Sequence, residues 1–258
     1  MTAPGMIPVT TICRFAKPAG TSVPKMRIRL RQVAFVASDL AGVEADIEEH
    51  LGLEPCFRDP GVARFGLQNV LYPVGDQLLE VVSPTEADTT AGRLLAKRGG
   101  DGGYMVILQV DDLEPCRRRF AETRARVVFE AAADGVTGLH LHPSDVGGAI
   151  LSVDRTDDWD AWPWAGPVWR DHVRTDVVQR IRAVEVQAHD PEAMAARWSE
   201  VLGITAGGTR VPLDEGEVRF VEVVDGRGEG VSGMELAATR PGDFEISGVR
   251  ISLVVEHA

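Results

Sequence analysis

The feature that most constrains the fold of this chain is a pattern that recurs three times. Residues 32–53, 105–128 and 183–204 each open with a short apolar run typical of a β-strand, continue with an Asp followed by Leu or Pro, and end in a helical pattern. Repeats of this kind indicate one supersecondary unit used several times, because a single unit cannot bury its apolar face alone. We therefore expect small modules that pack against one another.

Each repeat carries signals for where its helix begins and ends. Asp39, Asp112 and Asp190 stand directly before the helical pattern, where a carboxylate can accept hydrogen bonds from free backbone N–H groups. Gly52 and Gly203 stand where the helix must stop, as a left-handed C-terminal residue requires. These signals predict a helix directly after the first strand of each module.

Strand-like runs follow the helices and are separated by turn residues such as Gly75 and Asp76. The unit is therefore a strand, a helix and three strands, a βαβββ module of the α+β class. A fourth copy begins at Gly248 and supplies one strand before the chain ends, so we expect three modules plus a truncated fourth. The strands predicted after the helices are 63–67, 69–74 and 78–82 in the first module and 218–224 and 233–238 in the third.

Charge and cysteine usage limit the class of protein. The net charge of −12 argues against a nucleic-acid partner or an anionic membrane surface. No apolar run approaches the roughly 20 residues of a membrane span, and the N-terminus lacks the pattern of a signal peptide. The three cysteines, Cys13, Cys56 and Cys116, form no CxxC pair, which favours a reducing cytoplasm.

The patterning also predicts the domain organisation. Residues 1–25 are rich in Pro, Thr, Gly and Ala and predict a flexible extension, and Met26 is an alternative start to Met1. Residues 26–155 form a first domain of two modules. A Trp-rich linker covers 156–179, and residues 180–258 form a second domain with one module and a terminal strand.

Several motifs resemble those of the vicinal-oxygen-chelate (glyoxalase and bleomycin-resistance) superfamily. They are LLEVVSPT, then AGRLLAKRGGDGG, then LHLHPSDVGGAILSV, of which HPSDVGG is the most specific. In this order they make the first two modules most similar to methylmalonyl-CoA epimerases. The resemblance implies that the sheets of two modules pair and curl into a cup around the active site.

The resemblance also implies a divalent metal held by one side chain from the first strand and one from the last strand of each module. These positions are Gln32 and Glu80 in the first module and Met105 and Ser152 in the second. Met and Ser are poor ligands, so two of four ligands are left. We expect no cofactor, with a divalent metal at Gln32 and Glu80 as the alternative. In the second domain the same positions are Ala183, Glu235 and Arg250, and Arg250 opposite Glu235 suggests an ion pair.

Glu80 is the first candidate for catalysis. A carboxylate inside an apolar cup has a raised pKa and can serve as a general acid or base, whereas the alternative is a structural polar pair with Gln32. His140 and His142 share one face of a strand and would act as acid–base groups or donors if that face lines the cup. On the outside, His140 would be a surface residue and His142 part of a turn. The predicted catalytic residues are Glu80 and His142, and the predicted substrate-binding residues are Gln32, Met105, His140 and Ser152.

Four of the five tryptophans fall in the linker, at Trp159, Trp162, Trp164 and Trp169. They either cover the mouth of a cup and bind an apolar ligand or fix the two halves together or lie in a dimer interface. The second interpretation is preferred, because a linker that spans large sheets needs such anchors.

Two functions stay open at this point. The first is an epimerase, isomerase or lyase that acts next to a carbonyl or thioester with Glu80 as acid–base group. The second is a non-catalytic, resistance-type protein that binds a small molecule in a cup with a degenerate metal site. Because small modules need a partner to cover an exposed sheet edge, a homodimer is expected.

Overall fold

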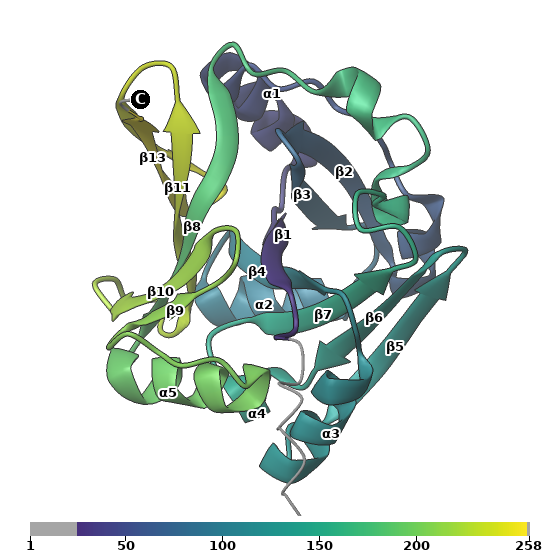
Figure 1. Ribbon diagram of the computed structural model, residues 1–258. Helices are drawn as coiled ribbons and strands as arrows, with labels where there is room; N and C mark the ends of the chain where they lie inside the picture. Colours follow the sequence, from purple (N-terminus) through teal and green to yellow (C-terminus); the bar gives the residue numbers. More distant parts are fainter. Residues whose placement is uncertain (1–24, 257–258) are drawn as a thin grey trace, which may run out of the picture.

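The computed structural model describes residues 25–256 and contains two curved mixed sheets that stand side by side (Figure 1). The extension predicted over residues 1–25 lies almost wholly outside the described residues. Within residues 25–256, no helix is both long and apolar enough to cross a membrane.

The first sheet has seven strands in the order β2-β3-β1-β4-β7-β6-β5. Two modules build it, because β1 pairs in parallel with β3 and β4 in parallel with β7, while β1 and β4 pair antiparallel at the centre. Its elements are β1 (Ile28–Val36), α1 (Leu40–Leu51), the 3-10 helix η1 (Pro60–Phe65), β2 (Leu67–Val74), β3 (Gln77–Pro84), α2 (Thr90–Arg98), β4 (Gly102–Val110), α3 (Glu114–Thr123), β5 (Val127–Ala133), β6 (Val136–Leu141), α4 (Pro143–Val146) and β7 (Ile150–Thr156).

The second sheet has six strands in the order β12-β13-β11-β8-β10-β9 and repeats this plan. Strand β8 pairs in parallel with β10, β11 pairs in parallel with β13, and β8 and β11 pair antiparallel. Its elements are β8 (Val178–Ala188), α5 (Pro191–Leu202), β9 (Arg210–Pro212), β10 (Glu217–Glu222), β11 (Gly230–Ala238), β12 (Gly242–Ile246) and β13 (Val249–Val255). The linker between the sheets carries two 3-10 helices, η2 (Pro163–Ala165) and η3 (Trp169–His172).

Strand pairing in the second sheet corrects the assignment of strands to modules. The run at 233–238, predicted as the end of the third module, lies in β11, which opens the fourth module. The run after Gly248 is β13, which closes that module, and the third module ends at β10. Only residues 239–241 separate β11 from β12, so the fourth module has no helix and lacks the strand–helix signature that identified the other three.

The predicted helix ends are mostly confirmed. Gly52 and Gly203 end α1 and α5 with left-handed φ values of 62° and 70°. The side chain of Asp190 accepts a hydrogen bond from the backbone N of Ala193 at 2.9 Å. Asp39 occupies the matching position before α1, but its side chain makes no capping hydrogen bond. The backbone conformation before the helix is therefore similar at Asp39 and Asp190, whereas of these two only Asp190 makes the capping hydrogen bond.

One predicted strand of the first module is wrong. Residues 60–65, which include most of the run at 63–67, form the 3-10 helix η1. Its start is fixed by Pro60 and by the side chain of Asp59, which accepts from the backbone N of Gly61 at 2.7 Å. Gly66 ends it with φ of 67°. The Pro and Gly that bound this short apolar run therefore outweigh its strand-like composition.

A continuous apolar core joins the two sheets. Leu30, Val33 and Phe35 of β1 are fully buried in the same cluster as Val184 and Val186 of β8, and α1, α3 and α5 add their apolar faces. The opposite, concave face of the first sheet carries a second, smaller cluster. That face holds the candidate site.

Glycine allows the sheets to approach each other closely at one point. A Cβ atom added to Gly103 of β4 would lie 2.2 Å from the Cβ of Val231 on β11. Real Cβ atoms do not approach this closely, so any larger residue at Gly103 must push β4 and β11 apart.

Candidate functional site

The concave face of the first sheet encloses a cavity of about 680 Å³. All seven strands of this sheet contribute residues to its walls, and η1, Trp164 and the residues before α2 complete it. Leu71, Met105, Ile107, Phe129 and Trp164 give the cavity a mainly apolar surface. Any polar group that faces this cavity is therefore removed from much of its water.

Glu80 faces the cavity from β3 and is held by two amide groups. Strand alternation directs Leu78, Glu80 and Val82 to the concave face, while the residues between them join the core. One carboxylate oxygen of Glu80 accepts from Nε2 of Gln32 at 2.8 Å and the other from Nδ2 of Asn69 at 2.7 Å. The side chain is 9% exposed. Burial raises the pKa of Glu80, and the two amide donors oppose that rise.

A tryptophan fixes the orientation of Gln32. The indole Nε1 of Trp162 donates to Oε1 of Gln32 at 2.7 Å. Because an indole N–H can only donate, Oε1 must face Trp162, and Nε2 must then face Glu80. The polar pair of Gln32 and Glu80, which the sequence offered as the alternative to catalysis, is therefore present, and it leaves the carboxylate able to accept a proton.

The side chains at the four family metal positions do not fit a divalent ion. The oxygen of Gln32 accepts from Trp162, and its nitrogen binds Glu80. Met105 offers a thioether, and the hydroxyl of Ser152 donates to the carboxylate of Asp154. A hard divalent ion needs several converging oxygen ligands. Among residues 25–256, no group of three or more His, Cys, Asp or Glu side chains could hold a metal.

The predicted ion pair between Arg250 and Glu235 on the second sheet is wrong. Arg250 contacts Glu185, whereas Glu235 pairs with Arg219 at 2.7 Å and with Arg182 at 2.9 Å. The error follows from the strand assignment, since β10 and not β11 is the last strand of the third module. The residue of β10 that matches Glu80 in register is Arg219, which lies opposite Glu185 as Glu80 lies opposite Ala34.

Asp154 is a second buried carboxylate that lines the cavity, and the sequence did not identify it. It is 2% exposed and accepts hydrogen bonds from the hydroxyl of Ser152 and from Nε1 of Trp164, the latter at 2.8 Å. Burial raises the pKa of Asp154 to about 7, against these two hydrogen bonds. The available signal was strand alternation, because Ile150, Ser152 and Asp154 share one face of β7.

The two histidines do not share a face. His140 lines the cavity, stacks edge-on with Phe129 at 5.3 Å between ring centroids, and has its pKa lowered to about 4 by burial. Strand β6 ends at Leu141, so alternation does not extend to His142. His142 lies outside the cavity lining, and its Nδ1 accepts from the backbone N of Ser144 at 3.2 Å. The structure therefore supports the turn interpretation of His142 and places His140 at the site.

Of the remaining predicted substrate-binding residues, Gln32 and Met105 line the cavity and Ser152 does not. Ser152 is fully buried, and its hydroxyl donates to Asp154, its neighbour on the same face of β7. Tyr104 lines the cavity as well, although the sequence gave no reason to select it. Burial raises the pKa of Tyr104 to about 12, so its hydroxyl stays protonated and can donate.

Three of the four tryptophans of the linker lie in the cup. Trp162 and Trp169 belong to the buried cluster of the concave face, and Trp164 packs against it. The preferred interpretation of these tryptophans as anchors between halves is wrong for these three, since they occupy part of the cup. They also bind the polar residues of the site, Trp162 through Gln32 and Trp164 through Asp154.

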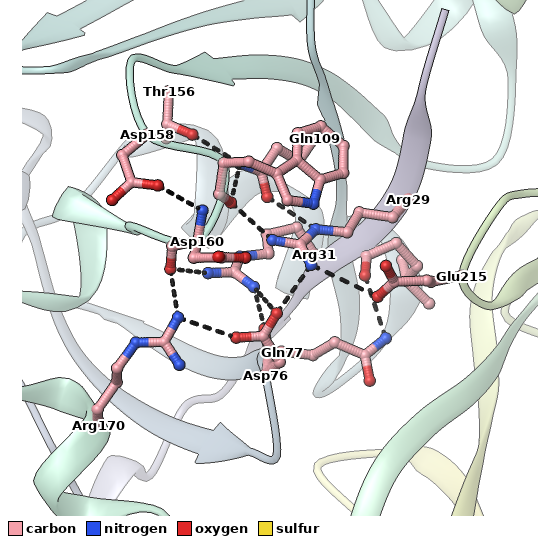
Figure 2. A network of polar contacts seen from close by, with 12 residues as sticks. Arg29, Arg31, Asp76, Gln77, Gln109, Thr156, Asp158, Asp160, Arg170 and Glu215 are labelled. Atoms are coloured by element: carbon pink, nitrogen blue, oxygen red, sulfur yellow. Dashed lines mark hydrogen bonds and ion pairs between the residues drawn. The ribbon is translucent and has the colours of Figure 1, made fainter.

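A network of buried arginines anchors this linker (Figure 2). Arg29 donates to the backbone oxygen of Trp159 at 2.8 Å, and Arg31 donates to that of Asp160 at 3.3 Å. Both guanidinium groups pair with Asp76 at 2.8 Å. Burial lowers the pKa of Arg31 to about 10, which leaves it charged at neutral pH. The network fixes the backbone that positions Trp162 and Trp164.

Similarity to known proteins is found among solved structures. No protein-family model matches the chain, and no curated protein matches it. A hypothetical protein from Staphylococcus aureus is 13% identical with a TM-score of 0.65, over 89% of this chain and 100% of that chain.

Two methylmalonyl-CoA epimerases match over 50% of this chain with TM-scores of 0.45. The Streptomyces coelicolor enzyme is 18% identical and 98% covered, and the Mycobacterium tuberculosis enzyme is 21% identical and 89% covered. The match to the Staphylococcus aureus protein shows a shared overall fold and carries no conclusion about activity. Strand pairing confirms the predicted α+β architecture: the chain has a glyoxalase-like fold of paired modules whose mixed sheets curl, and β4, α3, β5, β6 and β7 form one complete βαβββ module.

Proposed function

We propose that the cup of the first sheet binds a small organic molecule and that Glu80 transfers a proton at the carbon next to a carbonyl or thioester group. The reaction class is isomerisation, epimerisation or lyase-type elimination. The observation that carries the proposal is the position of Glu80, which is a buried carboxylate with a raised pKa on the wall of a mainly apolar cavity. Such a group is a stronger base than a carboxylate in water.

Two amide groups and a phenol support this chemistry. Glu80 takes the proton, and the electron pair of the broken C–H bond moves onto the carbonyl oxygen. Gln32 and Asn69 hold the carboxylate in one orientation before and after the transfer. The hydroxyl of Tyr104 can donate to the developing negative oxygen, which is electrostatic stabilisation without a metal. Return of the proton, or loss of a leaving group, completes the cycle.

Solvent deuterium exchange tests the proposal. The purified chain is incubated in D₂O with a panel of ketones and acyl-CoA thioesters, which the motif resemblance suggests, and exchange is followed by NMR. Glu80→Gln should slow exchange by about 100-fold or more, since positioned acid–base groups contribute that much. Glu222→Gln, at an exposed position at the end of β10, is the matched control and should leave the rate unchanged. Exchange that is equally fast in Glu80→Gln would refute the role of Glu80.

The second candidate is a non-catalytic binding protein. Two observations favour it: both oxygens of Glu80 already accept hydrogen bonds, and Trp162 and Trp169 occupy part of the cup. A ligand that binds in the cup and shows no exchange above the buffer rate would select this function. A stoichiometric divalent ion in the purified protein, measured by mass spectrometry, would instead support the alternative of a metal bound at Gln32 and Glu80.

We also propose that the chain is cytoplasmic and forms a homodimer. Strand β12 forms one edge of the second sheet and pairs only with β13 among the described strands. A second chain that covers such an edge removes unpaired backbone groups from water. Light scattering coupled to size-exclusion chromatography tests this, and a mass of one chain would contradict it.

A further inference from the structure

The carboxylates of the two cups differ in whether they have a cationic partner. On the second sheet, Glu185, Glu217 and Glu235 have side chains between 15% and 20% exposed, and each pairs with at least one arginine. On the first sheet, Glu80 and Asp154 are more deeply buried, at 9% and 2%. Their hydrogen-bond partners within residues 25–256 are only amide, hydroxyl and indole groups.

Among the described residues that line the cavity, no protonated side chain in its interior compensates these two carboxylates. His140 has its pKa lowered to about 4 by burial, so it is neutral at pH 7. The two arginines of the lining, Arg64 and Arg93, are exposed, and neither pairs with Glu80 or Asp154; the guanidinium of Arg64 lies over the rings of Phe65 and Phe129. The interior is therefore electronegative. Burial of a carboxylate without a cation is unfavourable, and such groups cluster at functional sites.

From this contrast we propose that the cavity binds an organic cation, a protonated amine or amidine, whose positive group pairs with Asp154 beside the ring of Trp164. The proposal uses the cup of the first sheet as the ligand site, as the proposed function does, and holds whether or not Glu80 performs chemistry there.

An ammonium group fits this surface better than a metal ion. It needs one carboxylate and is further stabilised by aromatic faces, whereas a divalent ion needs several converging ligands. Trp164 donates its Nε1 to Asp154, so its ring lies next to the carboxylate. Tyr104 adds aromatic surface to the same cavity, whereas the ring of Phe129 already faces the guanidinium of Arg64 at 5.4 Å. Under the proposed proton transfer, the substrate would then carry an amino group in addition to its carbonyl.

Three probes of nearly equal shape test the charge preference: benzylamine, benzyl alcohol and benzoate, titrated into the full chain and followed by calorimetry. Benzylamine should bind at least about tenfold more tightly than benzyl alcohol, and benzoate more weakly than both. Asp154→Asn keeps the size of the side chain and an acceptor for Trp164, and it should reduce the preference for the amine to about one. Glu222→Gln, which alters an exposed carboxylate at the end of β10, is the matched control and should keep the preference.

A measurement on the unaltered protein covers the case in which Asp154→Asn fails to fold. The ammonium pairs with the ionised carboxylate, so binding below the pKa of about 7 must displace the proton of Asp154. The binding heat at about pH 6 should therefore depend on the ionisation enthalpy of the buffer, and this dependence should vanish at about pH 8.5.

Four results would overturn the proposal. They are equal binding of amine and alcohol, tighter binding of benzoate, an unchanged preference in folded Asp154→Asn, and no binding of benzylamine up to about 10 mM, where even weak complexes are populated. The proposed function fails separately, through deuterium exchange that does not depend on Glu80. Exchange into neutral carbonyl compounds without any preference for amines would leave that function in place and remove only the cation.

Discussion

Replacing Asp154 by Asn should change how the free energy of unfolding depends on pH. The pKa of Asp154 rises from 3.8 to about 7 when the chain folds, because the folded state buries the carboxylate. Its neutral form is therefore favoured in the folded state. The stabilisation is complete below about pH 4 and is lost as the pH rises through about 7, where the folded state must ionise the buried group.

The magnitude follows from that difference. The pKa values differ by about 3 pH units, and each unit corresponds to about 1.4 kcal/mol, so the contribution of Asp154 falls by about 4 kcal/mol between acidic and neutral pH. This value is an upper bound, since any water that enters the cavity reduces the shift. The amide introduced by Asp154→Asn does not titrate, so this variant should gain stability relative to the unaltered chain as the pH rises.

Urea denaturation at several pH values between about 4.5 and 8 measures this difference by linear extrapolation. Glu80 also has a raised pKa, but it is present in both proteins and cancels in the comparison. Glu222→Gln controls for the loss of one exposed carboxylate. If the unfolding free energies of the unaltered chain and Asp154→Asn differ by a constant amount across this range, Asp154 ionises normally in the folded state and the argument from burial is refuted.

Three further substitutions test the packing around the site by urea denaturation. Trp162→Phe removes the donor to Gln32 and should cost about 1–3 kcal/mol, because a buried amide oxygen loses its partner; a cost near zero would mean that water replaces the indole. Gly103→Ala places a Cβ against Val231 and should cost about 1–3 kcal/mol, and a neutral result would show that the two sheets separate freely there. Arg250→Ala breaks an ion pair whose arginine is 60% exposed, so the loss should stay below about 1 kcal/mol; a larger loss would contradict the view of this pair as solvent-screened.

Much of the fold could be predicted because its strongest signals are local. Each of these helices ends in a left-handed residue, and Gly52 and Gly203 mark the two ends in the sequence. The start of the fourth module was not predicted because this module has no helix. No local signal in the sequence distinguishes β11 from one more strand of the third module. The 3-10 helix η1 was missed because composition was given more weight than the Pro and Gly at its ends.

Part of the site could be predicted from the family resemblance. The resemblance selected Gln32 and Glu80 on the first and last strands of one module, and the polar pair offered as their alternative role is present. Asp154 follows Ser152, the family metal position on β7, by two residues. Strand alternation alone would have placed Asp154 on the same face, in the cup. The contacts of Trp162 and Trp164 join the linker to strands of both modules, 130 and 10 residues away in the sequence. No local pattern encodes which surface a linker covers.

The two cups show that one module plan can give surfaces of opposite chemistry. Glu80 and Arg219 occupy the same register position, each on the last strand of the first module in its sheet. On the second sheet, Arg219 neutralises Glu217 and Glu235, so that surface needs no ligand to satisfy its charges. On the first sheet the position holds a carboxylate, Asp154 adds another, and the tryptophans of the linker supply donors without charge. These two carboxylates have no cationic partner among the described residues, and a positively charged ligand of the first cup is the partner that we propose for Asp154.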